Sequence, residues 1–178
     1  RMTRQLLSGL LLLVACRGED GPPARTGSGT TTHAPAHVQE NRDANRIEAR
    51  DLANYASRHR LATHISGTGV HHQLLRDLPG DTARPGQWAA VNYRMELLNG
   101  TVCSASEPGH PGSFQVEMDH VESGLHEAIQ HMSPGDSAVI LIPSYRAHGL
   151  VGDMDKVPMR SSLVYHIGLV SLSQPRGR

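Results

Sequence analysis

Twelve of the 178 residues are histidine, so a metal site is the first chemistry to consider. His126 and His131 flank Glu127 in a pattern close to the zinc-binding sequence His-Glu-x-x-His. Their five-residue separation places the two rings about 140° apart around a helix, so they cannot bind one metal ion from a single face. His71 and His72 are adjacent, and on a strand they would point to opposite faces. The remaining histidines are scattered, and the sequence therefore predicts no metal site.

The chain also lacks the motifs of several other functional classes. Ser161 and Ser162 do not lie in the Gly-x-Ser-x-Gly context of a nucleophile elbow. Residues 67–69 read Gly-Thr-Gly, without the third glycine and the following helix of a phosphate-binding loop. The 17 basic residues are balanced by 17 acidic ones, which leaves no net positive field to attract nucleic acid. The two cysteines, Cys16 and Cys103, are too few for a disulfide framework.

The first residues have the pattern of an export signal. Arg4 precedes an apolar run, Leu6–Val14, that is too short for a stable membrane span but suits the apolar core of a signal peptide. The run ends in Leu13-Val14-Ala15-Cys16, which resembles the lipobox of bacterial lipoproteins. We therefore predict that residues 1–16 are a lipoprotein signal peptide and that Cys16 is lipidated; an ordinary signal peptide is the alternative. We expect the protein to lie outside the cytoplasm, anchored by lipid to a bacterial cell membrane. The expected membrane is the outer membrane, on either its periplasmic or its surface side.

Two different segments separate this signal from the folded domain. Residues 17–37 are rich in Gly, Pro, Ser and Thr, and they cannot bury enough apolar surface to offset the entropy lost on ordering. We expect a flexible linker there. Residues 38–65 form a helical segment, because Val38–Leu61 lacks Gly and Pro and carries an apolar stripe through Ile47, Leu52 and Tyr55. A docking arm, a dimerisation element, a stalk and a solvated spacer all fit this pattern.

Residues 66–174 have the texture of an α+β domain. Alternating or continuous apolar runs predict strands at residues 70–75, 88–98, 114–118, 138–142 and 163–172. Asn99-Gly100 predicts a two-residue hairpin turn after the second of these strands. Apolar residues four, four and three positions apart predict one short helix over 121–131, and an irregular loop spans residues 144–158. A single helix among antiparallel strands indicates a sheet with the helix covering one face.

A series of short motifs follows in a fixed order between residues 68 and 172. It consists of Thr68-Gly69-Val70, Pro85-Gly86-Gln87, Val91-Asn92-Tyr93, Leu97–Val102, the segment 121–132, Pro134–Ala138, Ile142-Pro143, Val157-Pro158 and Leu163-Val164-Tyr165. In order and spacing the series resembles the FKBP-type peptidyl-prolyl cis-trans isomerases, with residues 121–132 in the place of the family's central helix. The signal peptide and the charged N-terminal helix further resemble lipid-anchored bacterial members of the Bacteroidetes type.

The resemblance implies a fold and an activity. The implied fold is a twisted antiparallel sheet wrapped around one short helix, with a shallow apolar pocket between them. The implied activity is cis-trans isomerisation of X-Pro bonds in exported polypeptides, without metal or cofactor. Uncatalysed rotation takes tens to hundreds of seconds because amide resonance sets a barrier of about 18–20 kcal/mol. An apolar pocket favours the twisted amide, which is less polar than the planar one.

Carried over to this sequence, the resemblance assigns ten residues to the pocket. The implied catalytic residues are Tyr93, His148 and Tyr165. The implied substrate-binding residues are Val102, Cys103, Phe114, Val121, Glu122, Leu125 and Val157.

Five of these positions depart from the family pattern. Val102 stands in the place of a phenylalanine, Cys103 of an aspartate, Glu122 of an isoleucine, Leu125 of a tryptophan and His148 of a tyrosine. The tyrosine hydroxyl normally donates to the substrate carbonyl, and an imidazole N–H can replace it only in the right tautomer. The backbone N–H of Glu122 can still serve as a donor. A catalytically weak peptide-binding or chaperone module on the same fold is therefore the alternative function.

Overall fold

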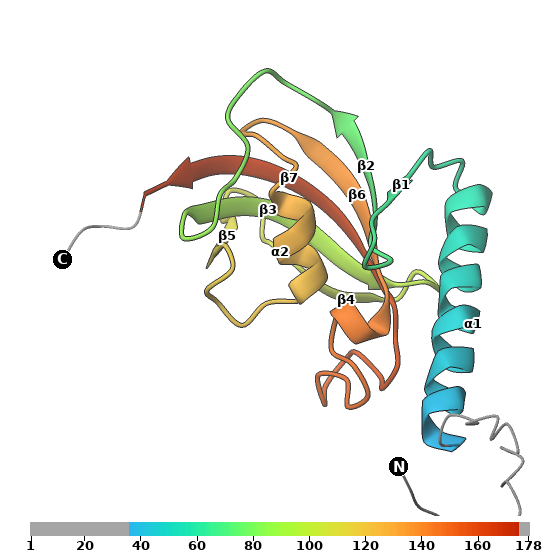
Figure 1. Ribbon diagram of the computed structural model, residues 1–178. Helices are drawn as coiled ribbons and strands as arrows, with labels where there is room; N and C mark the ends of the chain where they lie inside the picture. The colour runs from blue at the N-terminus through green and yellow to red at the C-terminus, as the bar shows by residue number, and fades with distance from the viewer. Residues whose placement is uncertain (1–35, 175–178) are drawn as a thin grey trace, which may run out of the picture. The chain divides into compact units, whose positions relative to one another are not determined.

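The computed structural model describes residues 36–174 (Figure 1). The predicted signal peptide, its Cys16 and nearly all of the predicted linker lie outside the described residues. The elements in chain order are helix α1 Ala36–Arg58, strands β1 His64–Ile65, β2 His71–Arg76, β3 Trp88–Leu97, β4 Val102–Ala105 and β5 Gly112–Gln115, helix α2 Ser123–Ile129, strand β6 Ser137–Ile142, the 3-10 helix η1 Ser144–Arg146 and strand β7 Leu163–Ser173.

All the strands belong to one antiparallel sheet. Its order is β1-β2-β6-β7-β3-β4, and β5 pairs with the remaining part of β3. The longest pairing joins β3 to β7, from Trp88 opposite Ser173 to Leu97 opposite Leu163. The sheet curves around α2, which confirms the predicted α+β architecture (Figure 1). The short strands β1 and β4 were not predicted, because runs of two and four residues carry too little periodicity to detect.

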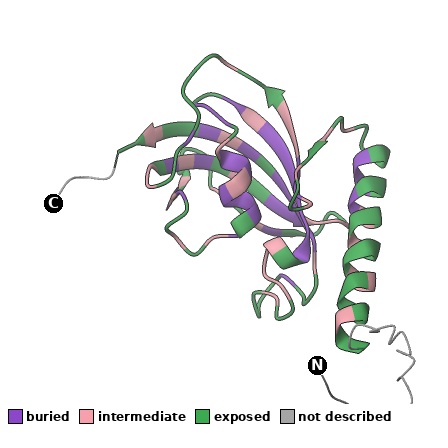
Figure 2. Ribbon diagram, in the orientation of Figure 1, coloured by how far each residue is buried: buried purple, intermediate pink, exposed green. Residues whose placement is uncertain are grey.

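Strand β6 is buried on both faces, which explains its continuous apolar sequence. Ala138, Ile140 and Ile142 belong to the core cluster that contains α2, whereas Val139 and Leu141 belong to a second cluster that contains α1. Successive side chains of a strand point to opposite faces, so a run without polar residues requires cover on both sides. The two helices supply that cover, and the strand is buried along most of its length in Figure 2.

Helix α1 docks on the sheet through its C-terminal half. Leu52, Tyr55 and Ala56 are buried there against Val139, Leu141 and Val164. Ile47, which the sequence placed on the same stripe, is 51% exposed. Helix α1 thus packs on the sheet of its own domain.

Asn41 and Glu48 of α1 instead make polar contacts with the segment that follows β6. The Glu48 carboxylate accepts hydrogen bonds from the backbone N–H and the hydroxyl of Ser144, at 2.9 and 2.7 Å. Arg160 donates to the side-chain oxygen of Asn41 at 3.0 Å. The helix therefore contacts η1 and the C-terminal part of the loop between η1 and β7.

Several predicted elements differ in their bounds from the structure. The helical segment predicted over 38–65 ends at Arg58, with β1 at 64–65, and the strand predicted at 114–118 is Gly112–Gln115. Helix α2 begins at Ser123 rather than at residue 121, because Glu122 has an extended backbone with φ −57° and ψ 131°. The hairpin between β3 and β4 is present, but its centre is Leu98-Asn99 rather than Asn99-Gly100. The N–H of Gly100 donates to the carbonyl of Leu97, and of the turn residues only Gly100 has a positive φ, +87°. Glycine takes this backbone conformation without steric cost.

Gly124 sets the distance between α2 and the sheet. A Cβ atom at this position would lie 2.5 Å from Cγ2 of Ile142 and 3.2 Å from Cγ2 of Val70. We predict that Gly124→Ala lowers the free energy of unfolding by about 1–3 kcal/mol, because the packed core must shift to admit a methyl group. Urea denaturation measures the change.

Gly67→Ala is the matched control. A Cβ atom there would meet no atom within 4 Å, and the backbone does not have a positive φ. Alanine should leave the stability unchanged or raise it by about 0.4–1 kcal/mol. Equal stabilities of the two variants would show that α2 does not approach β6 this closely.

Candidate functional site

A cavity of about 590 Å³ lies between the start of α2, strands β3, β4, β5 and β7, and the loop after η1. Its apolar lining residues include Val91, Phe114, Val121, Leu125 and Ile167. Phe114 and Leu125 are buried and belong to the main core cluster. The cavity is therefore an opening into the hydrophobic core of the domain.

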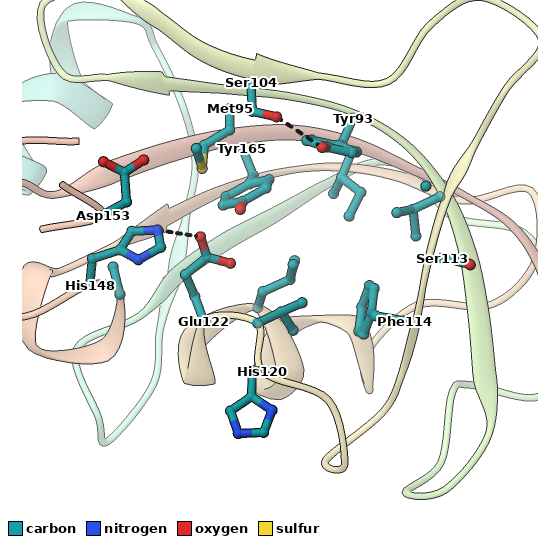
Figure 3. A pocket seen from close by; sticks show the side chains of 16 residues that line it. Tyr93, Met95, Ser104, Ser113, Phe114, His120, Glu122, His148, Asp153 and Tyr165 are labelled. Atoms are coloured by element: carbon teal, nitrogen blue, oxygen red, sulfur yellow. Dashed lines mark hydrogen bonds and ion pairs between the residues drawn. The ribbon is translucent and has the colours of Figure 1, made fainter. Parts of the chain in front are cut away.

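Hydroxyl groups also line the cavity. The Tyr93 hydroxyl lies 3.0 Å from the Ser104 Oγ (Figure 3). Tyr165 reaches the cavity from β7, with its ring centroid 6.0 Å from that of Tyr93. Burial raises the pKa of Tyr165 far above its ordinary value, and the negative charge of Glu122 raises it further. The Tyr165 hydroxyl consequently stays protonated and is able to donate a hydrogen bond.

An acid and an imidazole form the third part of the lining. His148 Nε2 lies 2.9 Å from Glu122 Oε1, and the Glu122 side chain is only 8% exposed (Figure 3). A neutral His148 in this contact must carry its proton on Nε2 and donate it to the carboxylate, which leaves Nδ1 as an acceptor. Asp153 lines the cavity on the same side as His148.

Seven of the ten sequence-predicted residues line this cavity. They are Tyr93, Phe114, Val121, Glu122, Leu125, His148 and Tyr165. They come from four elements and two loops, and only the curvature of the sheet around α2 brings them together.

Val102, Cys103 and Val157 do not line the cavity, which corrects their predicted placement. Val102 is 45% exposed, whereas Cys103 and Val157 are buried in the main core. A β-bulge explains the first two, because Met95 pairs with Ser104 while Glu96 pairs with Val102, and Cys103 is the extra residue between them. Ser104, and not Cys103, therefore faces Tyr93 in the cavity.

Sequence reasoning also missed several lining residues. Ser104, Asp153, Met95, Ser113 and His120 all border the cavity. Met95 could have been found, since it alternates with Val91 and Tyr93 along β3. Ser104 depends on the bulge and Asp153 on an irregular loop, and neither has a periodic signal in the sequence.

Three of the described histidines make contacts within the domain. His126 Nδ1 accepts the backbone N–H of Glu117 at 3.0 Å, and Nε2 donates to the carbonyl of Asp119 at 3.0 Å. His72 stacks on His131 with ring centroids 4.7 Å apart. Within residues 36–174, no group of three or more His, Cys, Asp or Glu side chains is arranged to hold a metal ion.

The placement of Cys103 and Ser104 can be tested with a thiol reagent. Burial raises the pKa of the Cys103 thiol, and the charge of Asp153 raises it further, so little of the reactive thiolate is present. In a Cys16→Ala background we predict that the native protein reacts slowly, and that Ser104→Cys adds one thiol that reacts quickly. Absorbance after addition of a disulfide reagent measures both rates.

Cys103 should react fully once guanidinium unfolds the chain. This control shows that the reagent is active and that burial causes the slow reaction in the native protein. Native Cys103 reacting as fast as the cysteine introduced at position 104 would contradict the bulge and the register of β4.

Comparisons with known proteins agree with this geometry. A family model described as FKBP-type peptidyl-prolyl cis-trans isomerase matches residues 80–170. A crystal structure of a peptidyl-prolyl cis-trans isomerase from Pseudomonas syringae superposes with a TM-score of 0.65 at 26% identity, covering 80% of this chain and 99% of that one.

Two curated relatives differ in how much of their length is matched. The peptidyl-prolyl cis-trans isomerase Mip of Coxiella burnetii is 26% identical over 67% of this chain, and the match spans about half, 51%, of Mip. FK506-binding protein 1 of Kluyveromyces lactis is 30% identical over 57% of this chain and 92% of its own length. Because the family match takes in every residue of the cavity and just over half of the 178 residues, this chain belongs to the FKBP-type peptidyl-prolyl cis-trans isomerase family.

Proposed function

We propose that the cavity catalyses cis-trans isomerisation of X-Pro bonds in polypeptides. The observation that carries this proposal is a cavity of about 590 Å³ lined both by apolar side chains and by the hydroxyl groups of Tyr93, Ser104 and Tyr165. An apolar wall of Phe114, Val121 and Leu125 suits a prolyl ring, which has no polar group of its own. The family membership of the chain supports the same reaction.

The proposed mechanism requires no covalent step. A planar amide loses resonance as it twists, and the twisted form is less polar than the planar form. Transfer from water into the cavity therefore costs the transition state less than the ground state. The protonated Tyr165 hydroxyl and the backbone N–H of Glu122 are the proposed donors that hold the substrate carbonyls.

The role of His148 depends on the partner of its Nε2–H. In the structure the neutral ring donates this N–H to Glu122, and its Nδ1 presents a lone pair. We propose that the Nε2–H of neutral His148 turns to the substrate carbonyl when a peptide binds, in place of the missing tyrosine hydroxyl.

The first test is the rate of cis-trans exchange in X-Pro peptides, measured by NMR exchange spectroscopy. The wild type should accelerate exchange. His148→Ala should lower kcat/KM by about tenfold, the effect of losing one hydrogen-bond donor in a dry site.

His110→Ala provides a matched control, because this histidine is exposed, does not line the cavity, and uses its ring only in a hydrogen bond with the Pro108 carbonyl. An unchanged rate in His148→Ala would remove His148 from the mechanism. No acceleration by the folded wild type would refute the catalytic function and favour the alternative, a peptide-binding or chaperone module on the same fold.

We also propose that the protein is exported and held at a bacterial membrane by lipid on Cys16. The apolar run Leu6–Val14 and the sequence ending in Cys16 support this location. Among residues 36–174, no helix combines the length and hydropathy needed to cross a bilayer. The proposed clients are proline-containing polypeptides folding outside the cytoplasm.

Lipidation is tested by cell fractionation. Cys16→Ala should move the protein from the membrane fraction to the soluble fraction, because the acyl chains that bind the bilayer would be lost. Cys103→Ala is the control, since its thiol is buried in the domain. Retention of the Cys16→Ala variant in the membrane fraction would refute the anchor.

A further inference from the structure

The charges around the cavity are unusual for a site that binds an apolar ring. Two carboxylates line it, Glu122 at the start of α2 and Asp153 in the loop after η1. None of the described residues that line it is lysine or arginine, and the only basic groups there are the imidazoles of His120 and His148. With neutral imidazoles, the cavity thus carries two negative charges and no positive one.

Glu122 acts from inside the cavity. Its side chain is 8% exposed, and its Oε1 is fixed by the 2.9 Å contact with His148. A neutral imidazole that donates one hydrogen bond orients the carboxylate but does not cancel its charge. Because little water surrounds the group, its field is screened less than that of a surface carboxylate.

Asp153 adds a second charge at the rim. Its Oδ1 accepts the backbone N–H groups of Asp155 and Val157, at 2.9 and 2.7 Å. These hydrogen bonds lower the pKa of the carboxyl group, so it remains ionised at neutral pH. They also fix the carboxylate to the loop, so that its position does not depend on a bound ligand.

We infer that this site selects polypeptides in which lysine or arginine adjoins the proline, and that it disfavours glutamate or aspartate there. The inference rests on the proposed function, because it names the substrate class of the same cavity. When the prolyl ring of a peptide packs on the apolar lining residues, the peptide side chains next to the proline come close to the carboxylates of Glu122 and Asp153. A cation there gains attraction and an anion meets repulsion in a partly desolvated site.

Exchange rates of three peptides that differ only in the residue before proline test this inference. The residues are lysine, leucine and glutamate, and NMR exchange spectroscopy avoids a protease with its own preference. We expect kcat/KM for the Lys-Pro peptide to exceed that for Glu-Pro by about tenfold or more, with Leu-Pro between them, and the ratio to fall as salt is added.

Glu122→Gln keeps a hydrogen-bond acceptor for His148 while removing the charge. It should reduce the Lys-to-Glu ratio by about threefold to fivefold, whatever it does to the absolute rates. Glu107→Gln is the matched control, because Glu107 is exposed and does not line the cavity. The same ratio in the wild type and in Glu122→Gln, or a wild-type preference for Glu-Pro, would overturn the inference.

The two proposals fail in different ways. Acceleration of Leu-Pro exchange with equal rates for Lys-Pro and Glu-Pro would refute the charge selectivity alone. Absence of acceleration for all three peptides would refute catalysis, and the dissociation constants of the same peptides from NMR titration would then decide the selectivity. A Lys-to-Glu affinity ratio that falls in Glu122→Gln supports the inference, and equal affinities overturn it.

Discussion

Burial of both faces of the β6–β7 region is the constraint on which the rest of the structure depends. β6 presents Ile140 and Ile142 to one side of the sheet and Val139 and Leu141 to the other, and these side chains are all buried. A sheet that is apolar on both faces has to be covered twice. Helix α2 covers the concave face and α1 the other, so both helices are required by the sequence of one strand.

The position of the cavity follows from that packing. Gly124 lets α2 lie against Ile142 and Val70, and the residues just before it, Val121 and Glu122, consequently reach the edge of the core. There the sheet curves away and leaves an opening instead of a filled interior. The apolar wall is thus a continuation of the hydrophobic core, and the reaction proposed for it uses the same exclusion of water that stabilises the fold.

The polar groups of the cavity have a different origin. Glu122 comes from the start of a helix, and His148 and Asp153 come from an irregular loop. Helix α1 contacts η1, just before this loop, through Glu48, and the loop itself through Asn41. An apolar position of the family pattern is replaced by a carboxylate, and a hydroxyl by an imidazole. The pair that results is a hydrogen bond between a carboxylate and an imidazole, which an isoleucine and a tyrosine could not form.

The sequence by itself determined the fold class, the main strands, the central helix and seven of the ten residues expected at the cavity. These features depend on periodicity and on ordered motifs, which are local properties of the chain. Only the tertiary structure decided that Ser104 rather than Cys103 faces Tyr93, that α1 covers the sheet, and that His148 is paired with Glu122. A bulge, a docked helix and a contact across 26 positions arise from pairing between distant segments, and such pairing leaves no periodic trace in the sequence.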